Sequence, residues 1–183
     1  MTPPTRLHTP TVELAEEWMA CVADFAGTAM DGSGSWAVTD FGPDRASLEA
    51  LLEMVRTEGD TTRDLGPDRV HSDYWWITTD GPDGTSPEVV GFVAVRHSID
   101  TANGFLRRQG GHIGYSVAPA HRRRGHAGRA LALALDRARE LGIEKALVTC
   151  ADDNAGSAAT IEKNGGVLED VLDGTRRYWI DLN

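Results

Sequence analysis

The chain is poor in cysteine, in long apolar runs and, in its first half, in basic residues. Two cysteines, Cys21 and Cys150, are too few for a disulfide framework, and a reducing cytoplasm is the expected location. The longest apolar stretches, residues 89–95 and 130–135, are far shorter than the ~20 residues of a membrane helix. The amino end, residues 1–6, has no basic start and no apolar segment. We therefore expect neither a membrane span nor a secretory signal.

The charge is acidic and unevenly distributed. The 183 residues carry 18 Lys and Arg against 28 Asp and Glu, a net charge of −10. Residues 1–90 hold 17 acidic and 5 basic side chains, a net charge of −12, whereas residues 91–183 are slightly basic. An acidic half repels phosphate, so nucleic acid is not expected as a partner. The acidic residues either attract a cationic or amine-bearing partner or only keep the protein soluble.

The length and the apolar content of 40% are those of one globular domain, residues 1–183. Hydrophobic periodicity predicts four helices, which cover residues 11–26, 44–58, 126–141 and 154–163. Their predicted N-caps are Thr11, Asp44 or Ser47 for the second helix, and Asn154; Gly142 follows the third. The predicted strands cover residues 74–79, 89–95, 112–117, 146–150, 167–169 and 177–180.

These elements predict an α/β (α+β) protein. A turn at residues 80–84 makes the first two strands an antiparallel hairpin, while the later helical crossovers allow parallel pairing, so the sheet should be mixed. Trp75 and Trp76 are consecutive, and we expect core packing for at least one of them. Residues 27–43 form a glycine-rich loop whose length is typical of functional or mobile segments.

The most informative stretch is the arginine- and glycine-rich turn at residues 122–128, between a strand and a helix. The first amides of a helix have no intrahelical partner, and the helix dipole adds positive charge there. Gly125 and Gly128 would let a phosphate approach the backbone, and the arginines would attract it. Alternatively, the arginines form a solvated turn and the glycines serve helix packing. The spacing fits neither a dinucleotide fold nor a P-loop.

Arg122, Gly125 and Ala127 match the [QR]-x-x-G-x-[GA] signature of the GNAT acyltransferases, and the chain resembles that family. Pro119, the helix after the turn and the stretch from Asn154 to two glycines fit the same pattern. The resemblance covers residues 85–183 well and the rest weakly. It implies a central mixed, mostly antiparallel sheet flanked by about four helices, and acetyl-CoA as the acyl donor.

The resemblance also implies roles for particular residues. Backbone groups of the strand with Tyr115 would meet the pantetheine arm, the turn would hold the pyrophosphate, and the next helix would touch the pantetheine or phosphate region. For Asn154 a plain helix cap is an alternative that is compatible with this role. The expected cofactor-binding residues are Ser116, Val117, Arg122, Arg123, Arg124, Gly125, His126, Ala127, Gly128, Asn154 and Ser157.

The chain departs from the family at Ile161, where many members have a tyrosine that protonates the leaving thiolate. Tyr115 and Tyr178 are candidate substitutes, each with core packing as the alternative. His112 is the candidate general base because histidine titrates near neutral pH. Its position in the strand has the parity of a core-facing side chain, so a structural role is the other reading. His97 is a weaker candidate.

We therefore expect a direct transfer of an acetyl group from acetyl-CoA to a primary amine, with His112 and Tyr115 as the catalytic residues. The expected acceptor is a small cationic or amino-acid-derived amine, and residues 27–43 would flank its cleft. A catalytically weak acyl-CoA-binding or sensing domain is the alternative. No metal is expected, since the histidines and cysteines show no ligand spacing. The assembly is left open between a monomer and a homodimer.

Overall fold

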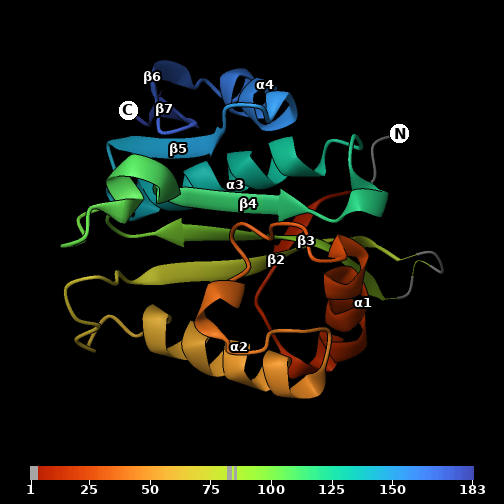
Figure 1. The fold of residues 1–183 in the computed structure, drawn as a ribbon. Helices are drawn as coiled ribbons and strands as arrows, with labels where there is room; N and C mark the ends of the chain where they lie inside the picture. Colours follow the sequence, from red (N-terminus) through yellow and green to blue (C-terminus); the bar gives the residue numbers. More distant parts are fainter. Residues whose placement is uncertain (1–3, 82–83, 85) are drawn as a thin grey trace.

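The computed structural model describes residues 4–81, 84 and 86–183. These form a seven-stranded sheet with the order β1-β2-β3-β4-β5-β7-β6 (Figure 1). The strands are β1 (Arg6–His8), β2 (Ser72–Asp80), β3 (Pro87–Arg96), β4 (Ile113–Val117), β5 (Lys145–Ala151), β6 (Val167–Leu172) and β7 (Thr175–Asp181). All neighbouring strands are antiparallel except β4 and β5. The mixed, mostly antiparallel sheet is thus confirmed, while β1 has no counterpart among the predicted strands.

Four α-helices flank the sheet within the described residues: α1 (Ala15–Phe25), α2 (Arg45–Gly59), α3 (His126–Glu140) and α4 (Ala155–Lys163). Shorter helical turns are η1 (Val12–Leu14), η2 (Ser35–Ala37), η3 (Leu106–Gly110, a π-helical turn) and η4 (Pro119–His121). Figure 1 shows α1 and α2 below β2 and β3, with α3 and α4 in the upper half beside β5. The helix predicted for residues 11–26 is shorter, because residues 12–14 form a separate 3₁₀ turn and the Thr11 side chain caps nothing.

Strand alternation divides the core into two layers. Trp76 and Phe92 pack with α1 and α2, whereas Ile77 and Val93 pack with α3 and α4. Consecutive residues of a strand point to opposite faces. Accordingly Trp76 is buried in the first layer, and the partly buried Trp75 packs against the second. The predicted hairpin is present, but residues 82 and 83 of its turn lie outside the described residues, as do residues 1–3 of the amino end.

The parallel pair β4 and β5 holds together only at one end. A single register pair, Ile113 with Val148, joins the two strands. Beyond it the strands separate, since β4 stays paired with β3 along its length while β5 pairs with β7. The α3 crossover begins at the separated end of β4. The two strands therefore separate beside the N-terminus of α3.

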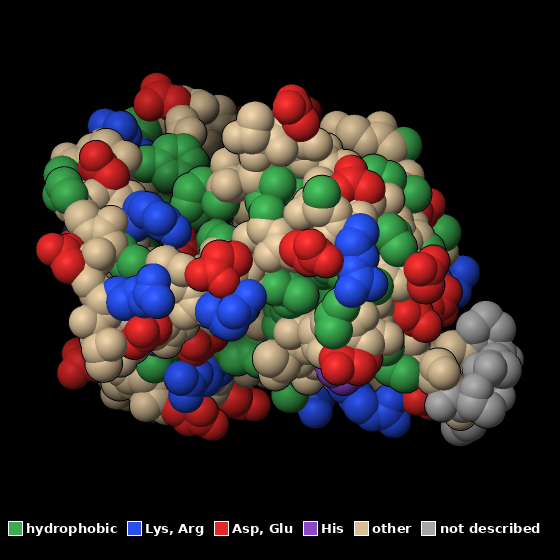
Figure 2. Space-filling view, turned by 90° about the horizontal axis from the view of Figure 1, so that it is seen from below, with side chains coloured by type: hydrophobic (Ala, Val, Ile, Leu, Met, Phe, Trp, Pro, Cys, Tyr) green, Lys and Arg blue, Asp and Glu red, His purple; other side chains and the backbone are tan. Residues whose placement is uncertain are grey.

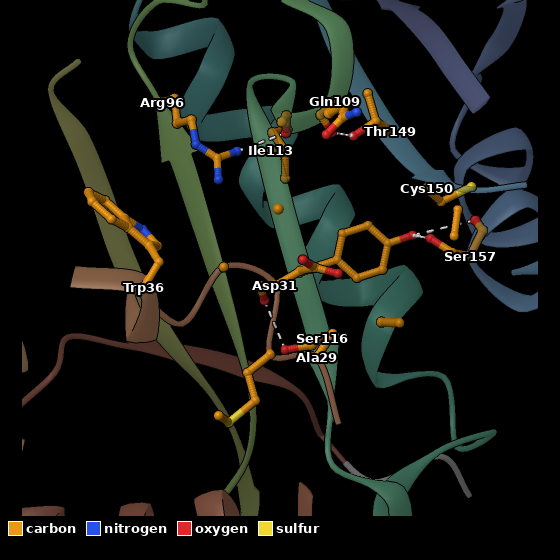
Figure 3. Close-up of a pocket in the computed structure, with 18 of the residues that line it drawn as sticks. Ala29, Asp31, Trp36, Arg96, Gln109, Ile113, Ser116, Thr149, Cys150 and Ser157 are labelled. Atoms are coloured by element: carbon orange, nitrogen blue, oxygen red, sulfur yellow. Dashed lines mark hydrogen bonds between the residues drawn. The ribbon is translucent and has the colours of Figure 1, made fainter. Parts of the chain in front are cut away.

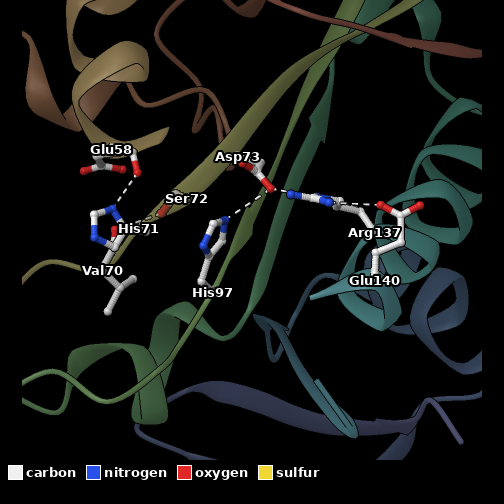
Figure 4. Close-up of polar contacts among 8 residues, drawn as sticks. All are labelled: Glu58, Val70, His71, Ser72, Asp73, His97, Arg137 and Glu140. Atoms are coloured by element: carbon white, nitrogen blue, oxygen red, sulfur yellow. Dashed lines mark hydrogen bonds and ion pairs between the residues drawn. The ribbon is translucent and has the colours of Figure 1, made fainter. Parts of the chain in front are cut away.

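A polar network ties the two helix layers to the other end of β2 and β3 (Figure 4). The Asp73 carboxylate accepts a hydrogen bond from Arg137 Nε at 2.9 Å and lies 3.2 Å from His97 Nε2. Arg137 also pairs with Glu140 at 3.0 Å on α3. His71 Nδ1 lies 3.0 Å from the carbonyl of Glu58, the last turn of α2. His97 is thus engaged outside the cavity described below.

On the face shown in Figure 2, the acidic side chains do not form one continuous negative surface. On the face that carries α1 and α2, acidic side chains are interspersed with basic ones (Figure 2). Several are in local ion pairs, such as Arg45 with Glu49 and Arg56 with Glu53 along α2. None of the helices among the described residues is long and apolar enough to cross a membrane.

Candidate active site

A cavity of about 1180 Å³ opens where β4 and β5 separate. Its wall is built from loop residues 28–36, β4, the turn before α3, the end of β5 and the start of α4. Figure 3 shows Trp36 and Arg96 on one side of β4 and Cys150 and Ser157 on the other. The cavity therefore extends to both sides of β4.

The turn before α3 has the backbone of an anion site. Arg123 and Gly125 have positive φ angles of 62° and 87°. No carbonyl among the described residues accepts a hydrogen bond from the amides of His126, Ala127 or Gly128, the first amides of α3. A Cβ added at Gly128 would meet nothing within 4 Å, so the space beside it is open. Unpaired amides at the positive end of a helix, beside open space, suit a phosphate group.

The three arginines of the turn differ in their placement. Arg122 and Arg123 line the cavity, and Arg122 Nε donates a hydrogen bond to the carbonyl of Val117 at 3.0 Å. That bond ties the turn to the end of β4. Arg124 is exposed and is not among the residues that line the cavity. Its side chain can act on a bound anion only through its charge.

His126 is buried at the first position of α3, where its Nδ1 lies 3.0 Å from the hydroxyl oxygen of Thr5. Burial lowers the pKa of this histidine, and the nearby His121 and Arg124 lower it further. The imidazole is therefore neutral at pH 7. What His126 presents to an anion is its backbone amide rather than a positive charge.

The start of α4 forms the opposite wall. Asn154 Oδ1 accepts a hydrogen bond from the Ser157 amide at 3.0 Å, which confirms the predicted helix cap. Both residues line the cavity, as do Ser116 and Val117 of β4. Ser116 also donates a hydrogen bond from its hydroxyl to the carbonyl of Asp31 at 2.8 Å. Loop residues 28–36 are thereby attached to the middle of β4.

Tyr115 spans the cavity from β4 to α4. Its hydroxyl oxygen lies 2.8 Å from the hydroxyl oxygen of Ser157 and 3.4 Å from the Ser157 carbonyl. Burial raises the pKa of Tyr115 to about 12, although the hydrogen bond with Ser157 lowers it in part. The phenol is therefore protonated at neutral pH. A group of this kind can donate a proton to a thiolate formed beside it.

His112 lies behind the cavity, between β4 and β5. Its amide donates to the Leu147 carbonyl at 2.7 Å, and its Nδ1 accepts from the Leu147 amide at 2.9 Å. Burial, and after it the positive charge of Arg96, lower the pKa of His112 to about 4. His112 does not line the cavity. These contacts favour the structural alternative for His112, because Nδ1 already accepts a hydrogen bond from the Leu147 amide of the neighbouring strand.

Ile161 is fully buried in the core between α3, α4 and the sheet. The α4 residue that faces the cavity one position earlier is Thr160, whose hydroxyl donates to the Gly156 carbonyl at 2.8 Å. Tyr178 is also fully buried, and its hydroxyl donates to Glu162 at 3.0 Å. Of the tyrosines considered from the sequence, Tyr115 is thus the one that lines the cavity.

Asp31 and Arg96 are among the charged residues of the cavity that the sequence reading missed. Asp31 lies in the loop after α1, and Arg96 is the last residue of β3. Asp31 stands in a glycine-rich segment without periodicity, so no local pattern marks it. Arg96 follows the apolar run of residues 89–95, and a charge at the end of a buried strand was the available signal. Neighbouring protein atoms displace water from Asp31 and raise the pKa of its carboxyl, while Arg96 lowers it in part.

The sequence profile described as Acetyltransferase (GNAT) domain matches residues 7–167. A search of curated protein sequences finds no significant match.

Among solved structures, the Microcin C7 self-immunity acetyltransferase MccE, in complex with acetyl-CoA and AMP, is 17% identical with a TM-score of 0.64. That match covers 97% of this chain and 92% of MccE. A putative ribosomal-protein-serine acetyltransferase from Vibrio cholerae is 16% identical over 99% of both chains, with a TM-score of 0.65. RimJ from Mycobacterium smegmatis, in complex with CoA-disulfide, is 20% identical over 98% of this chain and 88% of its own, with a TM-score of 0.65.

At this identity the solved structures establish the fold, and the profile match establishes the ancestry. The chain belongs to the GNAT acetyltransferase family.

Proposed function

We propose that the protein transfers an acetyl group from acetyl-CoA to a primary amine by direct attack within one ternary complex. The observation that carries the proposal is one continuous cavity that joins the open amides of the α3 turn to the Asp31 carboxylate across β4. The amides of the turn would bind the anionic acyl donor, and the Asp31 carboxylate would bind the cationic acceptor. The two meet at Tyr115.

The residues present fit acetyl-CoA. The amides from His126 to Gly128 would hold the pyrophosphate, with Arg122 and Arg123 adding positive charge. Asn154 and Ser157 would border the pantetheine arm. When bound, acetyl-CoA supplies the electrophilic thioester carbon and a thiolate leaving group. MccE was solved with acetyl-CoA and RimJ with CoA-disulfide, which supports the same ligand class here.

Asp31 is the group we propose to receive the proton of the acceptor. An amine attacks only when unprotonated, and a carboxylate whose pKa is raised binds a proton more readily than an ordinary one. Asp31 lines the cavity, whereas His112 does not. His112 instead holds β4 and β5 at the point where they separate.

Tyr115 is the proposed proton donor on the donor side of β4. Its phenol is protonated at neutral pH and faces Ser157 across the cavity. As the amine nitrogen bonds to the acetyl carbon, the carbon–sulfur bond breaks. Tyr115 gives its proton to the departing sulfur, and the proton lost by the amine goes to Asp31.

The replacement of the usual tyrosine by Ile161 favours a second candidate, a domain that binds acyl-CoA and turns it over weakly. Both functions predict CoA binding, so binding does not distinguish them. The test is thiol release from acetyl-CoA across a panel of amines, with mass spectrometry of the N-acetyl product. Turnover that depends on an amine supports the transferase. Hydrolysis at the same rate with and without amines contradicts it and supports the binding domain.

A further inference from the structure

Arg96 and the loop that carries Asp31 both approach β4 at Gly114. Gly114 has no side chain there, and a Cβ added to it would lie 3.2 Å from the Gly32 amide nitrogen and 3.5 Å from Arg96 Nη2. Asp31 is the residue next to Gly32. The guanidinium of Arg96 and the loop that carries Asp31 therefore flank one glycine, next to Tyr115 in the chain.

The Arg96 guanidinium is only partly engaged by the protein. Its Nη1 donates to the carbonyls of Gly110 and Gly111 at 2.9 and 3.1 Å. Within residues 4–81, 84 and 86–183, no carboxylate lies within ion-pair distance of Arg96, and Nη2 and Nε donate to no acceptor. A guanidinium keeps its charge under all physiological conditions and carries five donors. Arg96 can thus offer unused donors and an unpaired positive charge to a ligand in the cavity.

The Asp31 carboxylate is likewise without a partner in the part of the chain that the structure describes. Its backbone carbonyl accepts from Ser116, but neither side-chain oxygen has a hydrogen bond or an ion pair there. A different carboxylate of the cavity, the buried Glu58, is satisfied by Arg69 at 2.9 Å and by the Tyr74 hydroxyl at 2.7 Å. Arg96 is close enough to act on the titration of Asp31 without pairing with it. The space between them is bounded by two unpaired charges of opposite sign.

We propose that the acceptor is a free α-amino acid, with its amine held by Asp31 and its carboxylate by Arg96. This inference rests on the proposed function. An α-amino acid carries its two charged groups on one carbon, which suits one cavity lined by the unpaired carboxylate of Asp31 and the unpaired guanidinium of Arg96. Arginine donors suit the paired oxygens of a carboxylate. A polyamine or a protein amino terminus has no carboxylate beside its amine and would leave Arg96 unpaired.

The mouth of the cavity indicates an apolar side chain for this amino acid. Trp36 lines the cavity with 64% of its surface exposed, and the Arg69 guanidinium lies 5.7 Å from the centre of its ring. Phe105 also lines the cavity and is exposed. Two exposed aromatic rings in the lining of one cavity favour contact with an aromatic or aliphatic group.

The test compares three acceptors that share a side chain: L-phenylalanine, L-phenylalaninamide and phenethylamine. Because their amines differ in pKa, kcat/KM is compared at equal concentrations of unprotonated amine. We expect L-phenylalanine to be preferred by about tenfold or more, since one charge-assisted, bidentate contact distinguishes it. Arg96→Gln should reduce this preference to near unity, and Arg96→Lys should retain part of it. Arg63→Gln, an equal charge change at an exposed residue outside the cavity, should leave the preference unchanged.

The outcomes separate the subsite from the reaction. A wild-type preference near unity, or a preference that survives Arg96→Gln, overturns the α-amino acid proposal while amine acetylation stands. Absence of amine-dependent turnover with every acceptor, in a protein that binds acetyl-CoA, overturns the proposed function itself. If Arg96→Gln does not fold because the carbonyls of Gly110 and Gly111 lose their donor, the wild-type ratio and Arg96→Lys still decide the matter.

Discussion

The hydroxyl oxygen of Tyr115 lies 2.8 Å from that of Ser157, and this contact joins β4 to α4 across the space where β4 and β5 separate. It places a protonated phenol on the donor side of the cavity, although the usual tyrosine position is occupied by the buried Ile161. The proton donor can therefore come from the strand instead of from the helix.

Tyr115→Phe removes this donor and keeps the ring. We expect kcat to fall by about 100-fold, within the range of general-acid effects, while the affinity for acetyl-CoA measured by calorimetry stays the same. Tyr178→Phe is the matched control, because Tyr178 is buried outside the cavity. A folded Tyr115→Phe protein with wild-type kcat would remove the phenol from the mechanism.

Asp31→Asn keeps the shape of the side chain and loses its ability to take a proton. We expect kcat/KM for amines to fall at least tenfold, because proton transfer to a positioned base contributes at least that much. The raised pKa of Asp31 predicts that wild-type kcat/KM increases with pH as the carboxyl ionises, and the variant should lack this limb. Glu53→Gln, an equal charge change on the exposed face of α2, is the control. An unchanged pH profile in Asp31→Asn would argue against the base.

Bulk in the α3 turn should block the donor. Gly125→Val weakens acetyl-CoA binding but also strains the fold, because Gly125 has a φ of 87°. Gly128→Val is the sharper variant, since a Cβ there meets no protein atom within 4 Å and enters only the open space beside the amides. We expect its affinity for acetyl-CoA to fall at least tenfold with the melting temperature nearly unchanged. Gly59→Val, at an open position at the end of α2, should bind normally.

Asn154→Ala should cost about 1 kcal/mol of unfolding free energy through the lost cap, and it should also lower the affinity for acetyl-CoA. Asp44 caps α2 in the same way, with Oδ1 accepting from the Ser47 amide at 2.8 Å, but lies outside the cavity. Asp44→Ala should therefore lose similar stability and no affinity. Denaturant titration and calorimetry give both quantities. Equal affinities in the two variants would make Asn154 a cap alone.

His112 should act on stability. Its pKa of about 4 in the folded protein lies below the ~6.5 of an unfolded chain, so the folded state binds fewer protons between these values. The stability contributed by the neutral ring is complete above about pH 6.5 and is lost as the pH falls toward 4, by up to about 3 kcal/mol. His112→Asn, which cannot titrate, should show a smaller loss in denaturant titrations over this range.

The same variant tests the catalytic alternative for His112. If His112 has only a structural role, kcat/KM of the His112→Asn protein should still increase with pH as in the wild type. Loss of that limb in a folded His112→Asn protein would instead make the imidazole the base.

The sequence alone determined the backbone features of the proposed donor side of the cavity. The residues from Arg122 to Gly128 act through their own backbone, and the Asn154 cap depends on an amide three residues away. Such features are set by neighbours in the chain, so a local pattern reveals them. The same holds for the helix and strand periodicities, apart from the first turn after Thr11, where a 3₁₀ turn precedes α1, and apart from the short strand β1, which the pattern did not predict.

Only the tertiary structure decided the acceptor side. The Ser116 hydroxyl donates a hydrogen bond to the carbonyl of Asp31, which lies 85 residues earlier in the chain, and this contact holds Asp31 beside β4. The role of His112 likewise depends on Leu147, a residue of the neighbouring strand. Hydrophobic periodicity does not predict these contacts, because they depend on how the strands pair and where they separate. The proposed donor site is thus a property of one turn, while the proposed acceptor site forms only when the loop of Asp31 packs on the sheet.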